Sequence, residues 1–481
     1  MAAWTHVWAS DGDVVGNSAT IDVLGDGARA GALVLGAEVL GADTRVRTIR
    51  VGLLGYGRIG QAVAAVAARE SGRLAEFGLD IQCEAALVRL KHRPRPGAPA
   101  IDLLTDGREL ISSGVDVIVE ALGGVEPART LVAQALALGI PVVTANKSLV
   151  AAHGPELRAL AACNRVPFLC DAAALAGVPC LGALASRPLA SSVRTIAGVL
   201  NGTTHYILNA VANGASFESA LNDAQARGYA EPDSHADISG RDAAEKLTLL
   251  LQLAGCATVR TSDLTTRGID GISASDVACA RQLGGTIKPV ALASIGRDAG
   301  DESGAWVGPA FVDDGHLFAR LGGVTNAIAL TGDHGRASCF IGPGAGPEVT
   351  AATIIDDVVE VADAIEGRDT MEPRTFRSGV DPGSKDPGLH SVFHHARSFT
   401  SPSPSSWFVR LGNGSAFAAR DVAEFLAANH VPALQVTSVD GVVAARTVPS
   451  SWATVQSVVD ALNACGADAC ALPVLDAESR A

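Results

Sequence analysis

The chain has 481 residues, of which 48% are hydrophobic, 18% are charged and 4% are aromatic, a globular composition with room for roughly two to four domains. Its formal net charge of −14 argues against a nucleic-acid binder and against docking on an anionic membrane. No apolar run reaches the ~18 residues of a membrane-spanning helix. Nine cysteines without paired Cys-x-x-Cys spacing, and residues 1–47 without the pattern of a signal peptide, favour a cytoplasmic protein with reduced thiols.

The first clear elements follow an N-terminal extension, residues 1–47, to which the sequence assigns no role. A β-like run at 49–54 leads into Gly-x-Gly-x-x-Gly and then an Ala- and Val-rich helix. Alternating strands and helices come next: strands at 81–88, 115–122 and 140–145, and helices near 127–138 and 153–163. This alternation predicts a parallel sheet with helices on both faces, a Rossmann-type domain at 48–180.

The regular alternation of strands and helices ends at about residue 180, which predicts a separate α+β substrate domain at 181–334. A strand-like "VRTIAGVL" precedes a long helical stretch from about 202 to 255, and further strand-like runs follow at "IKPVALASI", "GPAFV" and "GVTNAIAL". A glycine turn then feeds a helix that we expect to return to the first domain, at 335–372. Residues 373–405 resemble a linker, and 406–481 have the β, α, β, β, α, β order of a ferredoxin-like module.

The glycine turn at the first strand end is typical of a dinucleotide site. Gly55 would make the turn, Gly57 would let the backbone approach a pyrophosphate, and Gly60 would let the helix pack on the strand. Arg58 and Ile59 lie between the last two glycines, where the helix N-terminus offers amide donors to phosphates. The alternative is an ordinary βα turn.

The end of the second predicted strand favours NADP(H). An NAD site usually has an acid there to hold the ribose hydroxyls, whereas this strand ends in "ALVRLKHRPRP". Arg89, Lys91, Arg93 and Arg95 suit a 2′-phosphate, and NADH remains a possible cofactor. For every one of these residues except Arg89, a solvated basic loop is an equal alternative.

The stretch "GYAEPDSHADISGRDAAEKL", residues 228–247, gathers five carboxylates and one lysine. Asp242 and Lys246 are four residues apart, so they would share one face of a helix. Taken alone, they could equally be a surface ion pair. Lys147 follows a predicted strand end, where doubly wound sheets place their ligands, so it is well placed to meet a nicotinamide and a substrate. On position alone, a surface lysine is an equal alternative.

Six ordered blocks resemble the signature segments of homoserine dehydrogenases, over about residues 48–372. They are "VEALGGVEPA", "VVTANKSLVAAHG", "GVLNGTTHYIL", "AQARGYAEPDSHADISGRDAAEKL", "GGVTNAIAL" and "GPGAG". The resemblance implies reduction of L-aspartate 4-semialdehyde to L-homoserine with NADPH or NADH, in the pathway to threonine and methionine. It also implies a small amino-acid substrate, a substrate and dimerisation domain, and a homodimer or homotetramer.

The resemblance also assigns roles to particular residues. Lys246 matches the family's proton donor or acceptor, and with Lys147 and Asp242 it forms the candidate catalytic set. Substrate contacts are implied for Glu231, Asp237 and Asp242, and cofactor contacts for Gly228 and Gly344.

Three departures from the family pattern affect expected sites. "CDAAALAGVP" resembles the segment that binds a monovalent cation, Na⁺ or K⁺, through Asp171 and the carbonyls of Ala174, Ala176 and Val178, but the family usually has Glu in place of Asp171. The C-terminal module resembles an ACT domain without its Asp-x-Pro-Gly turn, which argues against threonine inhibition. His205 stands where the family commonly has Asn.

These departures leave two alternatives open. His205 and the altered loop "EPDS" would suit a related NADP-linked oxidoreductase that acts on another amino-acid semialdehyde. Asp171 and the degenerate C-terminal module would suit a non-catalytic, nucleotide-binding assembly protein.

Overall fold

The computed structural model of the chain describes residues 46–178, 180, 193–256, 258–296, 303–333, 337–370, 406–412 and 417–476. The N-terminal extension up to residue 45 and the predicted linker at 373–405 lie outside these ranges. Within them, no helix combines the length and the hydropathy that crossing a bilayer requires.

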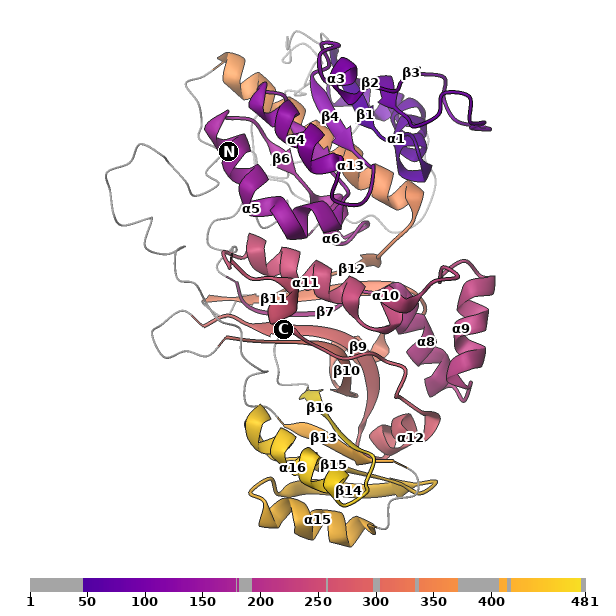
Figure 1. The fold of residues 1–481 in the computed structure, drawn as a ribbon, viewed down its shortest axis with the longest axis vertical. Coiled ribbons are helices and arrows are strands. Elements are labelled where there is room, and N and C mark those ends of the chain that lie inside the picture. Colours follow the sequence, from indigo (N-terminus) through magenta and orange to yellow (C-terminus); the bar gives the residue numbers. More distant parts are fainter. Residues whose placement is uncertain are drawn as a thin grey trace, which may run out of the picture. The chain divides into compact units, whose positions relative to one another are not determined.

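A six-stranded, all-parallel sheet forms the N-terminal part, with strand order β3-β2-β1-β4-β5-β6 (Figure 1). This is the doubly wound order with its switch point between β1 and β4. The alternating pattern predicted the parallel sheet but not this order. The strands are β1 (Arg47–Leu54), β2 (Leu79–Leu87), β3 (Asp102–Leu104), β4 (Val117–Glu120), β5 (Val142–Thr144) and β6 (Phe168–Leu169).

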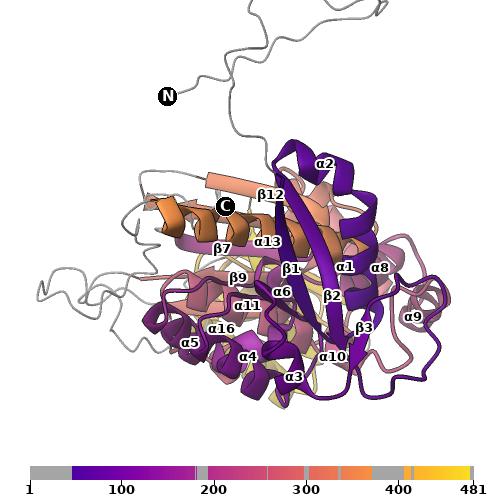
Figure 2. The same ribbon diagram turned by 90° about the horizontal axis from the view of Figure 1, so that it is seen from above.

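Helices cover both faces of this sheet. Val117 and Val119 face one core and Ile118 faces the other, as the two-residue period of a doubly buried strand requires. The first core is closed by α1 and α13, which lie side by side although they are far apart in sequence (Figure 2). The helices are α1 (Arg58–Arg69), α2 (Ser71–Glu76), α3 (Gly107–Ile111), α4 (Ala128–Ala137), α5 (Lys147–Cys163), α6 (Asp171–Ala174) and α13 (Pro347–Thr370).

The central part is built on a second, mixed sheet with strand order β12-β11-β7-β9-β10, and β8 pairs with β10. Its core against α8, α9 and α12 lies on one face, and α11 packs on the other. The strands are β7 (Val193–Val199), β8 (Thr265–Thr266), β9 (Gly285–Ser294), β10 (Gly304–Asp313), β11 (Thr325–Gly332) and β12 (Ala337–Pro343). The helices are α8 (Gly202–Ala212), α9 (Phe217–Ala226), α10 (His235–Ile238), α11 (Arg241–Leu253), α12 (Ala274–Gln282), η1 (Thr261–Asp263) and η2 (Leu317–Arg320).

The C-terminal module has the predicted ferredoxin-like order, with strands arranged β16-β13-β15-β14. β16 also pairs in parallel with β10, so the module continues the central sheet instead of forming a separate one. Its elements are β13 (Trp407–Leu411), α15 (Ala419–Ala428), β14 (Ala433–Val439), β15 (Val442–Thr447), α16 (Trp452–Ala464) and β16 (Ala469–Leu475). The fold class expected from the sequence is therefore confirmed, while the exact domain limits stay a prediction.

Two element predictions are corrected. The helix expected near 153–163 begins six residues earlier, at Lys147, because the side chain of Asn146 accepts a hydrogen bond from the Leu149 amide and caps it. β12 was missed, because its last residues, Gly342 and Pro343, had been assigned to the glycine turn before α13.

Candidate active site

The glycine turn between β1 and α1 has the geometry of a phosphate-binding loop. Gly55 has φ +110°, and a side-chain carbon there would come within 2.7 Å of the Ala121 carbonyl oxygen. A side-chain carbon at Gly60 would clash with the carbonyl oxygen of Gly55, so this glycine lets the helix lie against the turn. A side-chain carbon at Gly57 would meet no other atom within 4 Å. The open side of the turn is thus at Gly57, where a pyrophosphate would need it.

A cavity of about 620 Å³ lies at the carboxyl end of β2, in the basic loop that follows it. Arg89, Lys91 and Arg93 line it, together with Leu90, His92 and Thr105. Arg95 does not line it; its guanidinium donates instead to the carbonyls of residues 90, 91 and 93 and holds the loop in shape.

Asp242, in the first turn of α11, is the centre of the second cluster. Its Oδ1 accepts from the Lys147 ammonium, and its Oδ2 accepts from Asn201 Nδ2 at 2.8 Å and is ion-paired with Lys246 Nζ at 3.1 Å. Lys147 comes from the start of α5 and Asn201 from the N-cap of α8, so three segments distant in sequence meet at one carboxylate.

Asn201 joins a second acid to this centre. Its Oδ1 accepts from the Thr204 amide at 2.8 Å, which fixes the amide orientation and turns Nδ2 toward the carboxylates. The two Nδ2 hydrogens go to Asp242 and to Asp237 Oδ1, the latter at 2.7 Å. Sequence reasoning had missed Asn201, although its place before a predicted helix marks it as a cap.

The charges in this cluster stabilise one another. Burial alone would raise the pKa of Asp242, but the positive charges of Lys246 and Lys147 outweigh it and hold this pKa far below its usual range. Burial alone would lower the pKa of Lys147, but the Asp242 carboxylate raises it above the ordinary value. For Asp237, burial dominates and raises the pKa.

Both lysines keep N–H groups available for a ligand. Lys246 Nζ donates to the Leu200 carbonyl at 2.7 Å and is ion-paired with Asp242, and within the described part of the chain it has no other acceptor. Its side chain is 12% exposed, whereas that of Lys147 is 35% exposed and, among the described residues, bonds only to Asp242. A largely buried lysine thus lies beside a more accessible one.

A buried glutamate, which the sequence analysis had also missed, positions Lys147. Glu120, fully buried at the end of β4, accepts from the Leu122 amide at 2.8 Å, from Thr144 Oγ1 at 2.5 Å and from Asn146 Nδ2 at 3.3 Å. Burial raises the pKa of Glu120 despite these bonds. An acid inside the predicted strand "VDVIVEAL" was the signal, because a buried carboxyl group needs partners.

Gly344 lies against the same cluster from the side of α13. A side-chain carbon there would clash with the amide of Asn326, whose Nδ2 donates at 3.0 Å to the Leu200 carbonyl that also accepts from Lys246. Asn326 is fully buried, and its Oδ1 has no hydrogen-bond partner among the described atoms.

The remaining predicted residues are not drawn into these clusters. Glu231 is exposed, and only its backbone carbonyl has a described bond, from Gln225 Nε2 at 3.4 Å. Gly228 has φ +72° just after α9, and Arg58 is exposed at the start of α1 beside the partly buried Ile59.

The expected cation segment lies against α13. Asp171 starts α6, and the Ala176 carbonyl accepts from Thr353 Oγ1, while Ala174 and Val178 are buried. Asp357 of α13 is 5% exposed with an unpartnered Oδ2, and burial, followed by the charge of Asp171, raises its pKa well above the usual range. Across the described residues, no three His, Cys, Asp or Glu side chains are grouped to hold a metal ion.

The chain is similar to known proteins over most of its length. A family model described as homoserine dehydrogenase matches residues 179–359, and one described as its NAD-binding domain matches residues 55–171. A homoserine dehydrogenase of Synechocystis sp. is 36% identical over 328 residues, which are 67% of this chain and 75% of that protein. One from Corynebacterium glutamicum is 34% identical over 319 residues, 65% and 72% of the two chains.

A solved structure gives the same result. The crystal structure of a homoserine dehydrogenase from Thiobacillus denitrificans matches with a TM-score of 0.76 at 29% identity, covering 90% of this chain and 99% of that one. These similarities support the dehydrogenase expectation and neither of the two alternatives. The chain belongs to the homoserine dehydrogenase family.

Proposed function

We propose that this chain reversibly reduces L-aspartate 4-semialdehyde to L-homoserine with NADPH, and that Lys246 is the proton donor. The observation that carries the assignment of roles is the meeting of Lys147, Asp242 and Lys246 at one buried site. An amino-acid substrate brings an ammonium group and a carboxylate, and this site offers both carboxylates and cations.

The chemistry follows from what each side chain can do. A bound nicotinamide would supply the hydride to the aldehyde carbon. The carbonyl oxygen then gains an electron pair, and the free N–H of Lys246 points to this lysine as the group that protonates it and stabilises the developing charge. In homoserine oxidation the neutral amine of Lys246 takes the hydroxyl proton. Asp242 holds both lysines in place, and Lys147 and Asp237 remain for the charged ends of the substrate.

The direct test is steady-state homoserine oxidation with NADP⁺ and with NAD⁺, each with and without threonine. We expect activity with NADP⁺ at a lower KM than with NAD⁺, and no inhibition by threonine. A panel of other amino-acid semialdehydes should be reduced poorly. Activity with one of them and none with aspartate semialdehyde would contradict the proposed substrate.

The cavity behind β2 supports the preference for NADPH. Arg89→Gln should raise the KM for NADPH by at least about tenfold and leave that for NADH unchanged. The reason is that only NADPH has a 2′-phosphate, which would lose its ion pair with the Arg89 guanidinium. Arg73→Gln, which removes a charge from α2, is the matched control and should change neither KM. An equal effect of Arg89→Gln on both cofactors would contradict this role.

We also propose a monovalent cation, Na⁺ or K⁺, on Asp171 and the carbonyls of Ala174, Ala176 and Val178. The residues fit such an ion in that burial, followed by the charge of Asp171, raises the pKa of Asp357, whose buried oxygen has no described partner. A positive charge nearby would stabilise both carboxylates. Replacing K⁺ by tetramethylammonium should lower both the activity and the melting temperature, and Asp171→Asn should remove this dependence of the melting temperature.

The other features implied by the resemblance are proposed on that basis. They are substrate contact by Glu231, cofactor contact by Arg58, Ile59, Gly228 and Gly344, a homodimer or homotetramer, and a cytoplasmic location. Light scattering during size-exclusion chromatography tests the oligomeric state, and a monomeric mass would contradict it.

A further inference from the structure

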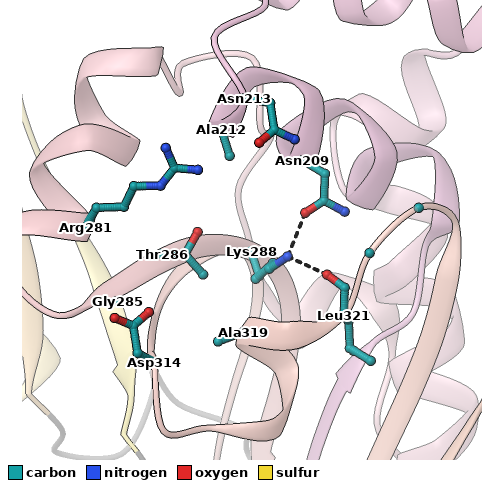
Figure 3. Close-up of a pocket in the computed structure, with 12 residues that line it drawn as sticks. Asn209, Ala212, Asn213, Arg281, Gly285, Thr286, Lys288, Asp314, Ala319 and Leu321 are labelled. Carbon is teal, nitrogen blue, oxygen red and sulfur yellow. Dashed lines mark hydrogen bonds between the residues drawn. The ribbon is translucent and has the colours of Figure 1, made fainter.

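A second cavity, of about 410 Å³, lies in the central part of the fold beside the C-terminal half of α8 (Figure 3). Its walls come from α8, the end of α12, the start of β9 and the segment from residue 314 to 323. None of its lining residues belongs to the site around Asp242. Its volume is within the range of small-molecule sites, about 300–1,000 Å³.

A buried lysine forms part of the wall. Lys288 is 4% exposed, and its Nζ donates to Asn209 Oδ1 at 2.6 Å and to the Leu321 carbonyl at 2.7 Å, as the dashed lines of Figure 3 show. The third neighbour is His205 Nε2 at 3.5 Å. Among the described residues, no carboxylate lies within ion-pair distance of this ammonium group.

His205 does not supply the missing charge. Its Nδ1 lies 3.0 Å from the Thr325 carbonyl, and because a carbonyl only accepts, Nδ1 carries the hydrogen and Nε2 is a neutral acceptor facing Lys288. Burial, followed by the positive charge of Lys288, lowers the pKa of His205 to about 4, which keeps the ring neutral. The ammonium group is therefore surrounded by neutral acceptors only.

An uncompensated buried ammonium group is costly. Burial accordingly lowers the pKa of Lys288 to about 8, and no neighbouring negative charge counters this effect. An anion in the cavity would provide the missing counter-charge.

Other donors surround the same cavity. Asn209 Nδ2 is buried and has no hydrogen-bond partner in the described part of the chain. Arg281 is exposed at the end of α12 and extends toward Ala212 and Asn213 (Figure 3). Asn213 is also exposed. Arg281 has no ion-pair partner among the described side chains, so its guanidinium is available to a ligand.

One acid limits the charge of that ligand. Asp314 lines the cavity together with these donors, and it would repel a doubly charged phosphate more than a single carboxylate. We propose that this cavity binds a small monocarboxylate, held by Arg281 and the amides of Asn209 and Asn213 and balanced in charge by Lys288. This site is distinct from the proposed substrate site and does not depend on it.

Isothermal titration calorimetry of the full chain tests the proposal with a matched pair of probes, propionate and propionamide, which share a shape and differ in charge. Inorganic phosphate is the third probe, and sodium chloride keeps the ionic strength constant. We expect propionate to bind at least about tenfold more tightly than propionamide or phosphate.

Substitutions locate the binding. Arg281→Gln and Lys288→Met should each weaken propionate binding at least about tenfold, whereas Arg420→Gln on α15, an equal change of charge elsewhere, should leave it unchanged. If Lys288→Met does not fold, the exposed Arg281 carries the test alone.

Lys147→Gln separates this cavity from the active site. Loss of propionate binding in Lys147→Gln but not in Arg281→Gln would place the carboxylate at the active site and overturn the proposal. Preferential binding of phosphate, equal binding of propionamide, or no heat with any probe would also overturn it.

Discussion

Asp242 controls the charge of the proposed active site, because both lysines depend on it. It accepts hydrogen bonds from Lys147 and Asn201 and is ion-paired with Lys246, while its own side chain is only 8% exposed. With Asp242 ionised, each of its two carboxylate oxygens faces one lysine, and its charge raises the pKa of Lys147 against the effect of burial.

Replacement of Lys246 by methionine should abolish most of the turnover and keep cofactor binding. Methionine preserves the apolar stem but cannot give a proton, and loss of a general acid costs about 10²–10⁴ in rate. We expect kcat to fall by this factor, with the Kd for NADPH unchanged in a fluorescence titration. Arg241→Gln is the control, because the Arg241 side chain lies on the same helix and is 74% exposed. This variant should retain kcat. A Lys246→Met enzyme as active as the parent would remove Lys246 from the mechanism.

Asp242→Asn should destabilise the protein in a pH-dependent way. The folded pKa of Asp242 lies below the unfolded value of about 3.9, so its stabilising effect is fully present above about pH 4 and is lost as pH falls through the folded pKa. The variant leaves the largely buried Lys246 and the partly exposed Lys147 without their carboxylate, at a cost of about 3–5 kcal/mol in the free energy of unfolding.

Denaturant unfolding at pH 8, 6, 4 and 3 measures this difference. We expect the gap between parent and variant to be constant from pH 8 to about pH 5 and to narrow below about pH 4. Asp233→Asn, on the exposed loop before α10, is the control and should have the same free energy of unfolding as the parent at each pH. A gap that widens as pH falls would contradict the assigned direction of the pKa.

Local spacing predicted only part of this cluster. An ion pair between Asp242 and Lys246 could be predicted from their separation of four residues, and in the structure Lys246 Nζ lies 3.1 Å from Asp242 Oδ2. The contact of Asp242 with Lys147, 95 residues away, needed the family resemblance to be expected at all. Asn201 was missed even so, because its capping role is local whereas its bonds to Asp237 and Asp242 depend on the tertiary fold.

At the scale of elements, the three glycines of the β1–α1 turn have separable roles. Gly57→Ala adds a methyl group to open space, so we expect the free energy of unfolding to change by no more than about 0.5 kcal/mol. The same methyl group would stand where the backbone must approach the pyrophosphate. The Kd for NADPH should therefore rise at least about tenfold, measured by fluorescence titration.

Gly60→Ala should fail in a different way. Its methyl group would clash with the Gly55 carbonyl, so the helix must move, at a cost of about 1–3 kcal/mol in stability as well as weaker NADPH binding. Gly72→Ala on α2, which also meets nothing within 4 Å, should stabilise the chain by about 0.4–1 kcal/mol with normal binding. Equal stability of the Gly57 and Gly60 variants would contradict the separation of roles.

Errors in the predicted elements occur where local signals and tertiary contacts disagree. Pro155 stands inside α5, and a proline after a glycine indicates a helix boundary from sequence. The helix nevertheless continues through it, with Asn146 as its cap and the Glu120 contacts behind that cap. Strands buried on both faces, such as β4, had no such conflict between local signals and tertiary contacts and were located correctly.

For the whole molecule, the sequence predicted the C-terminal module but not its attachment. The order of strands and helices from β13 to β16 is visible in local periodicity. The parallel pairing of Phe311 with Val474 and of Val312 with Leu475 joins strands about 160 residues apart, for which no local pattern exists. Arg446 bonds to Asp313 at 3.2 Å across the same junction.

Because the two sheets are continuous, we expect the module and the central part to unfold together. Phe408 of β13 is fully buried and stacks on Phe311 of β10, with ring centroids 5.6 Å apart. Phe408→Ala should lower the free energy of unfolding by about 3–5 kcal/mol, and the loss should be shared by both sheets. Differential scanning calorimetry should show the transition of the central part moving down in temperature with that of the module.

Leu434→Ala in β14 is the matched control, since it removes an apolar side chain of the same module that is 58% exposed. It should leave the melting profile nearly unchanged. If Phe408→Ala instead produced a separate low-temperature transition, with the main transition and the thermal loss of dehydrogenase activity unmoved, the module would be an independent unit. The sheet continuity through β10 and β16 would then contribute little to stability.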